Sequence, residues 1–230
     1  IYLVGKESKI GYDNTHLKSL IVIEGIFNKL FGIILNEKED TIIRNDCLVL
    51  INSLLKYNTM NQRIFVEDMK NLDGIISALW KYVHGPFQWV MNSDTDEDLN
   101  ILSNIILIIN SLVEEGTDIT TENQNRLYFD SSISMVLIQL CFNPDILIDY
   151  RIAFLDCLSR IIKKNEAIQE QFGSINVKLF DPMSTATENK SSSPRPDDNV
   201  VLPIYKLVLN WSTKLTSIHA LKLRMACMDL

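Results

Sequence analysis

The sequence is poor in the residues that make tight turns, with 8 glycines and 6 prolines among 230 residues. Three of the prolines, Pro194, Pro196 and Pro203, lie close together near the end of the chain. Hairpins draw on such residues and on period-two alternation of apolar and polar side chains, of which the chain has almost none. These shortages exclude an all-β architecture.

Cysteine is also scarce, and its spacing is not that of a metal or redox motif. Cys47, Cys141, Cys157 and Cys227 are far apart, and no C-x-x-C pair occurs. Each lies within a helical apolar pattern, so we interpret all four as small buried hydrophobic residues. A reducing, cytosolic setting fits this pattern.

Basic residues are outnumbered, with 22 Lys and Arg against 29 Asp and Glu, a net charge of −7. This balance argues against nucleic acid or an anionic membrane as the partner, because phosphate lattices bind clustered Lys and Arg. The longest charge-free apolar run, Leu99–Val113, is too short and too polar to span a bilayer. The chain starts at Ile1 and stops at Leu230 inside an apolar pattern, which indicates a piece of a longer protein.

Motifs of catalysis and metal binding are missing. The sequence has no G-x-S-x-G, H-E-x-x-H, G-x-G-x-x-G or Walker loop, and its three histidines are far apart. Asp94–Asp98 begins like a calcium loop, but Leu99 stands where a glycine must turn and Ile105 where a bidentate Glu is required. We therefore interpret Asp94–Asp98 as an acidic loop that caps a helix beginning near Leu99, and we expect no enzyme activity, metal or cofactor.

Helical periodicity fills most of the chain instead. In Ile42–Tyr57 apolar residues recur at spacings of one, three and four, and polar residues lie on the other side. The same layout returns 58 residues later in Leu99–Glu114 and again, 49 residues further, in Ile148–Lys164. Shorter helices are expected over Leu72–Val83 and Ser131–Phe142. Each long copy is a candidate for the last helix of a repeat.

The spacing is close to the armadillo and HEAT unit of about 40–47 residues, with insertions. We predict an all-α fold, an armadillo/HEAT-like right-handed α-solenoid of about four repeats, truncated at both ends and forming one domain over 1–230. The expected segments are repeats at roughly 17–70, 71–130, 131–175 and 200–230, an insertion at 84–98 and a mobile loop at 181–199. The helical pattern resumes over Leu202–Trp211.

Each long helix is followed by a similar polar segment. Asn61-Gln62 precedes Phe65, and Asn123-Gln124 precedes Phe129; the third copy is Gln169–Phe172. We interpret this pattern as a polar turn followed by an aromatic plug, at the start of the next layer's first helix.

A polar stripe on the last helix of each repeat is the candidate binding site. Its members are Asn52, Lys56, Asn110, Glu114, Ser159 and Lys163. In armadillo-type stacks these helices line the concave face, where the stripe would be offered to a partner. The alternative is that the stripe is only the solvent side of amphipathic helices. Its mixed charges do not favour a strongly charged peptide as the partner.

The segment Ile42–Lys56, continued by Asn58, Asn61-Gln62 and Phe65–Glu67, resembles the globular head of the general vesicular transport factor family. That head carries a repeat close to D-C-L-x-L-x-x-N-L-L-K-x-N-x-x-N-Q-x-x-F. Further segments resemble the family in the same order: Leu147–Phe172, Ser193–Pro196 and Val200–Val208. The resemblance covers roughly Leu30–Val208.

This resemblance implies a non-enzymatic, armadillo-like head of a golgin that tethers vesicles in ER-to-Golgi and intra-Golgi transport. It implies a cytoplasmic protein, peripheral on Golgi and vesicle membranes, with Rab-family GTPases, SNAREs and other Golgi tethers as partners. It also implies a homodimer through a coiled coil that this chain does not contain. Another armadillo/HEAT adaptor, such as a GTPase-regulatory or transport-receptor segment, remains the alternative.

Overall fold

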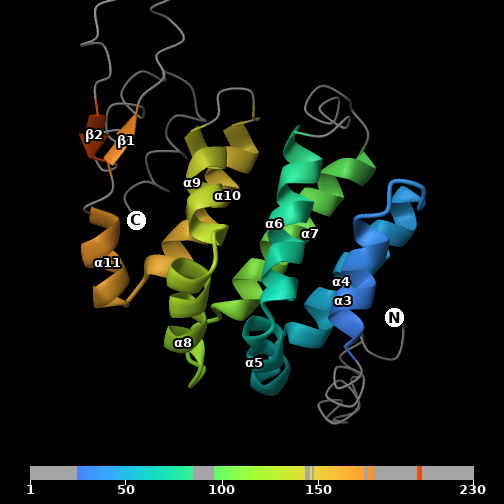
Figure 1. Cartoon of the computed structure of the whole chain (residues 1–230), viewed down its shortest axis with the longest axis horizontal. Helices are drawn as coiled ribbons and strands as arrows, with labels where there is room; N and C mark the ends of the chain where they lie inside the picture. Colours follow the sequence, from blue (N-terminus) through green and yellow to red (C-terminus); the bar gives the residue numbers. More distant parts are fainter. Residues whose placement is uncertain are drawn as a thin grey trace, which may run out of the picture. The chain divides into compact units, whose positions relative to one another are not determined.

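The computed structural model describes residues 25–84, 96–142, 146, 148–173, 176–178 and 201–203. Their regular structure is helical apart from one two-stranded ribbon (Figure 1). In chain order the elements are α3 (Ile26–Ile34), α4 (Thr41–Leu55), α5 (Thr59–Glu67), α6 (Met69–His84), α7 (Asp96–Leu112), α8 (Thr120–Asn125), the π-helix η2 (Arg126–Asp130), α9 (Ile133–Phe142), α10 (Ile148–Ile162), α11 (Glu166–Gly173), β1 (Asn176–Lys178) and β2 (Val201–Pro203). The chain divides into two compact units between Lys163 and Lys164.

The first unit is a stack of helix layers. Helices α3, α6 and α9 pack in succession, and so do α4, α7 and α10, each helix also packing on its neighbour in the other row (Figure 1). The short helices α5 and α8 join the rows, since each follows one repeat's last long helix and precedes the next repeat's first. The arrangement of short, long and long helices is that of armadillo-like repeats, so the predicted all-α fold is confirmed.

The long helices lie where the apolar periodicity places them. Thr41–Leu55, Asp96–Leu112 and Ile148–Ile162 correspond to the three predicted copies, with ends that shift by up to three residues. Asp40 fixes the first of them, because its carboxylate accepts a hydrogen bond from the Ile42 backbone N–H at 2.8 Å. Helix α7 begins at Asp96 rather than near Leu99, so part of the expected acidic loop forms its first turn.

The predicted insertion at 84–98 and loop at 181–199 lie largely outside the described residues. The end of the insertion is the start of α7, and its first residue, His84, is the end of α6. Cys47, Cys141 and Cys157 are buried free thiols, as the sequence predicts.

An aromatic cluster fills the core between α3, α5 and α6. Phe65 is fully buried and packs edge-on against Phe27, with ring centroids 4.9 Å apart. Phe31 also contacts the Phe65 ring, with centroids 6.2 Å apart, and lies against Gly74 of α6, where an added Cβ would meet its ring atoms at 2.6 to 2.9 Å. A residue without a side chain at 74 is what allows α3 and α6 to approach this closely.

The predicted polar turn at Asn61-Gln62 is wrong. Both residues lie inside helix α5 and are fully buried. The helix begins earlier than expected because the Asn58 side chain caps it, accepting a hydrogen bond from the Asn61 backbone N–H at 3.0 Å.

The predicted plug in the second copy is wrong as well. Leu127 is fully buried, whereas Phe129 is 46% exposed. Leu127 follows Gln124 by three residues, as Phe65 follows Gln62, so spacing and not aromatic character decides which side chain points inward.

The second unit contains α11 and the ribbon. Asn165 caps α11, its side chain accepting a hydrogen bond from the Ile168 backbone N–H at 3.3 Å. Strand β1 pairs antiparallel with β2, Val177 lying opposite Leu202. The helical pattern expected from Leu202 is therefore wrong at the start: Val201–Pro203 is extended, and Pro203 has no N–H for a helix interior. The rest of the expected fourth repeat lies outside the described residues.

Candidate functional site

The polar stripe comes from three helices that the fold places side by side. Asn52 is in α4, Asn110 in α7 and Ser159 in α10, and these helices pack against one another in that order. Lys56, Glu114 and Lys163 stand just beyond the ends of the same helices. The structure thus brings the stripe together along one row of helices, as the repeat pattern predicts.

The members of the stripe differ in exposure. Lys56 and Lys163 are exposed, whereas Asn52, Asn110 and Glu114 are half-buried. Ser159 is only 6% exposed, so it belongs to the packing between helices and cannot contact a partner without a rearrangement. The surface that remains is basic at both ends and carries amide and carboxylate groups between them.

Hydrogen bonds between α4 and α7 use part of the stripe. The Ser111 hydroxyl donates to Asn52 Oδ1 at 2.7 Å, and Asn104 Nδ2 donates to Asn45 Oδ1 at 2.8 Å. The tripeptide Asn-Ser-Leu occurs in both helices, at 52–54 and at 110–112, and the asparagine of the first copy accepts a hydrogen bond from the serine of the second. Asn52 is therefore a contact between layers as well as a surface group.

Two acceptor atoms in the middle of the stripe have no hydrogen-bond partner among the residues that the structure describes. Asn110 Oδ1, in the last turn of α7, and Glu114 Oε2, two residues beyond the end of that helix, are both buried. A buried acceptor without a donor is costly, but both atoms are covered, so a partner's donor reaches them only after a rearrangement.

Lys163 at the end of the stripe is held by Glu115, its ammonium nitrogen 2.6 Å from a carboxylate oxygen. Both side chains are about half exposed, so water and salt screen the pair and its contribution to stability is small. The pair spans from the end of α10 to the turn after α7, which fixes the direction of the lysine.

Buried asparagine–glutamine pairs join the helix ends beneath the stripe. Asn61 Nδ2 donates to Leu54 O at 2.8 Å. Gln62 Nε2 donates to Leu55 O at the end of α4 (3.1 Å) and to Ser111 O at the end of α7 (2.8 Å). The last carbonyls of a helix have no partner within it, so each of these bonds satisfies a group that would otherwise lack one.

The next layer repeats this arrangement. Asn123 Nδ2 donates to Leu112 O at 2.7 Å, at the end of α7. Gln124 Nε2 donates to Arg160 O at 3.0 Å and to Lys163 O at 2.9 Å, at the end of α10. The two pairs thus connect the ends of α4, α7 and α10, which fixes the spacing of the stripe residues that stand there.

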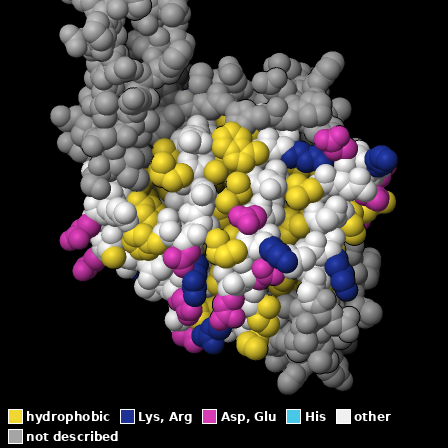
Figure 2. All heavy atoms as spheres, in the orientation of Figure 1, with side chains coloured by type: hydrophobic (Ala, Val, Ile, Leu, Met, Phe, Trp, Pro, Cys, Tyr) yellow, Lys and Arg dark blue, Asp and Glu magenta, His cyan; other side chains and the backbone are white. Residues whose placement is uncertain are grey.

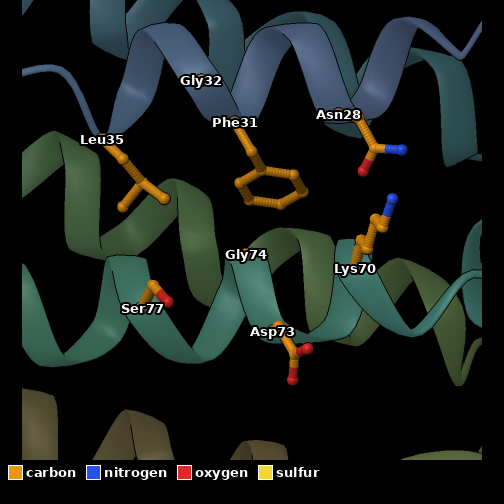
Figure 3. A pocket seen from close by; sticks show the side chains of 8 residues that line it. All are labelled: Asn28, Phe31, Gly32, Leu35, Lys70, Asp73, Gly74 and Ser77. Carbon is orange, nitrogen blue, oxygen red and sulfur yellow. The ribbon is translucent and has the colours of Figure 1, made fainter.

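A shallow groove lies between α3 and α6, with a volume of about 410 Å³ (Figure 3). The Phe31 ring points from α3 toward Gly74, and Asn28, Lys70 and Asp73 lie around it (Figure 3).

On the face of the molecule that Figure 2 shows, Lys and Arg side chains lie among Asp and Glu, with hydrophobic side chains between them.

Two basic groups with shifted pKa values lie in the helix packing. Burial lowers the pKa of Arg151 to about 10, and its Nε donates to Cys141 O at 2.9 Å. Burial also lowers the pKa of Lys81, with a smaller contribution from Arg44, and Lys81 Nζ donates to Leu35 O at 2.7 Å. Arg151 and Lys81 therefore hold the ends of helices together.

Within the described ranges, no three His, Cys, Asp or Glu side chains are grouped as a metal site would require. Among the helices of the same ranges, none is both long and apolar enough to cross a membrane.

No family model matches the chain. The chain is 32% identical over 217 residues, 94% of its length, to "Intracellular protein transport protein USO1" of Saccharomyces cerevisiae. The chain is homologous to the Uso1 intracellular protein transport proteins. A second relative, "Intracellular protein transport protein uso1" of Schizosaccharomyces pombe, is 27% identical over 77% of the chain. The chain spans 12% and 16% of the lengths of these two relatives.

Solved structures of Uso1 have the same fold. The structure titled "Crystal structure of Uso1-2" superposes with a TM-score of 0.76 at 30% identity, and covers 94% of this chain and 31% of its own. A second Uso1 crystal structure gives a TM-score of 0.74 at 31% identity. The family resemblance drawn from Ile42–Lys56 and the segments after it is confirmed.

Proposed function

We propose that this chain is part of the head of a vesicle tether that acts in ER-to-Golgi and intra-Golgi transport, as a scaffold without a catalytic role. The observation that carries the proposal is the homology to Uso1 over 94% of the chain, together with the shared fold. The first unit supports it physically, because buried amides and apolar layers hold exposed groups of successive repeats at fixed spacing.

We further propose that the polar stripe contacts protein partners. The half-buried Asn110 and Glu114 side chains suit a partner that donates hydrogen bonds, from a main chain or from Lys or Arg. Lys56 and Lys163 on either side suit carboxylates. A Rab-family GTPase, a SNARE or another Golgi tether is the proposed class of partner. The complete protein is proposed to be cytoplasmic and peripheral on Golgi and vesicle membranes, and dimeric through a coiled coil outside this chain.

A segment exchange tests the proposed role in transport. In S. cerevisiae the part of Uso1 that matches this chain is replaced by the chain, and movement of a secreted cargo from the ER to the Golgi is followed in cells that lack the native protein. Transport close to the native rate is expected. A matched exchange with an armadillo segment from an unrelated protein serves as the control. If the exchanged protein is present at normal levels but transport stops, as it does in that control, the proposed role is wrong.

A binding measurement tests the proposed partner class. The full 230-residue chain is titrated with a Rab-family GTPase loaded with GTP or with GDP. We expect the GTPase to bind the chain in one of its two nucleotide states. The substitutions Asn110→Ala and Glu114→Gln are expected to weaken that binding. If the GTPase binds in neither nucleotide state, the Rab-family GTPase is removed from the proposed partners. The transport test is not affected by that result.

A further inference from the structure

Helix α5 has an outer face that the stack leaves in solvent. Its inner side chains, Asn61, Gln62, Phe65 and Val66, are all buried. Met60 is 54% exposed, and Arg63, one turn further along the same face, is also exposed. Lys56 and Tyr57 stand immediately before this helix and are exposed too. We name these four residues, Lys56, Tyr57, Met60 and Arg63, the α5 edge.

Tyr57 is held in a conformation that tyrosine disfavours. Its φ is 57°, in the left-handed region, and its side chain is 63% exposed. Lys164 has a φ of 60° in the corner after α10, and Gly116 has 89° in the turn after α7. A residue in the left-handed conformation after the last long helix is therefore a feature of the repeats. The exposed aromatic side chain of Tyr57 at this position contributes little to the packing. A strained, exposed aromatic residue that the fold does not need is a candidate for binding.

The α5 edge itself has two basic residues and no acidic one, and the nearest carboxylate along the helix is that of Glu67, one turn after Arg63. No Asp or Glu occurs between Cys47 and Val66, although the whole chain has a net charge of −7. The ion pairs among the described side chains link three other basic residues to carboxylates: Arg126–Asp130, Arg160–Asp156 and Lys163–Glu115. Lys56 and Arg63 belong to none of these pairs. The Lys56 ammonium lies 5.0 Å from the centre of the Tyr57 ring, which keeps the charge beside the aromatic surface.

We propose that the α5 edge binds an acidic segment of a protein partner. Tyr57 and Met60 supply an aromatic and a flexible apolar contact, and such residues, together with Arg, are enriched at the centres of protein interfaces. Lys56 and Arg63 pair with carboxylates on either side of that contact. Two basic groups are few for holding an anionic membrane, so a protein segment fits better. The inference rests on the proposed role as a binding scaffold and adds a surface distinct from the middle of the stripe.

The test uses the full 230-residue chain and a fluorescent amphipathic peptide with Glu on one face and Leu and Phe on the other. A counterpart with Lys in place of each Glu is the charge control. We expect only the acidic peptide to bind, and Arg63→Glu to weaken it about ten-fold. Tyr57→Gly is expected to weaken binding to a similar extent without lowering the thermal midpoint, because glycine is relaxed at this φ.

Met135→Ala and Phe129→Ala remove equally exposed side chains elsewhere, at 49% and 46% exposure, and are expected to leave binding unchanged. The proposal is overturned if the acidic peptide does not bind, or if Tyr57→Gly and Arg63→Glu leave its affinity unchanged. It is also overturned if phosphatidylserine vesicles, and not the peptide, bind in a Tyr57-dependent way. The assay contains no transport step, so its failure and a failure of the segment exchange are distinguishable.

Discussion

Replacing Gln62 with methionine tests whether buried amides hold the repeats in register. Methionine keeps an unbranched side chain of similar length, so the helix itself is little affected. The change removes the hydrogen bonds from Gln62 Nε2 to Leu55 O and to Ser111 O, the carbonyls at the ends of α4 and α7. Because the side chain is fully buried, water cannot readily replace either bond.

The expected loss of stability follows from these contacts. Each lost hydrogen bond costs about 1 kcal/mol net, and each carbonyl left buried without a donor adds to that cost. Gln62 Oε1 is buried and has no partner in the described part of the chain. Removing it relieves an unfavourable contribution and makes the net loss of stability smaller. We expect the free energy of unfolding to fall by about 2 kcal/mol.

Urea denaturation followed by circular dichroism measures this change. Gln139→Met replaces an exposed glutamine on α9 and is the matched control, with an expected effect within about 0.5 kcal/mol. A Gln62→Met variant as stable as its control would refute the inference that this amide stabilises the junction of the layers.

Two further sets of variants probe the packing. Gly74→Ala is expected to lower stability by about 1–3 kcal/mol, because its Cβ would meet the Phe31 ring, whereas Gly32→Ala, with open space at its Cβ, should raise the stability of α3 by up to about 1 kcal/mol. Thermal melts compare the two, and equal effects would contradict the close approach of α3 and α6. A double-mutant cycle of Asn52→Ala and Ser111→Ala should give a coupling of about 0.5–1.5 kcal/mol in urea denaturation; additive effects would show that this bond contributes nothing.

The sequence predicted the long helices well because their apolar periodicity extends over four turns. It failed at Asn61 and Gln62, since polar residues are normally placed at the surface and the sequence does not show which distant carbonyls they reach. It also chose Phe129 over Leu127 as the plug, because it weighted aromatic character above helical spacing. The extended Val201–Pro203 depends on pairing with Asn176–Lys178, which no local pattern reveals.

The candidate site was predicted in position but not in detail. Periodicity placed the six stripe residues on one side of their helices, and the stacking of α4, α7 and α10 brought them together. The same periodicity could not show that Ser159 is covered or that Asn52 is bonded to Ser111, because both depend on the neighbouring layer. The α5 edge was missed because the left-handed corner at Tyr57 carries no glycine to mark it.

The most direct test of the scaffold account measures transport with a changed stripe in a protein that still folds. The exchanged Uso1 would carry Lys56→Ala, Asn110→Ala and Lys163→Ala, none of which removes a buried hydrogen bond that the structure shows. The account predicts that the free energy of unfolding in urea stays within about 1 kcal/mol of the unchanged protein. It also predicts slowed movement of cargo from the ER to the Golgi. Transport at the full rate by this folded triple variant would contradict the claim that the stripe contacts the partners.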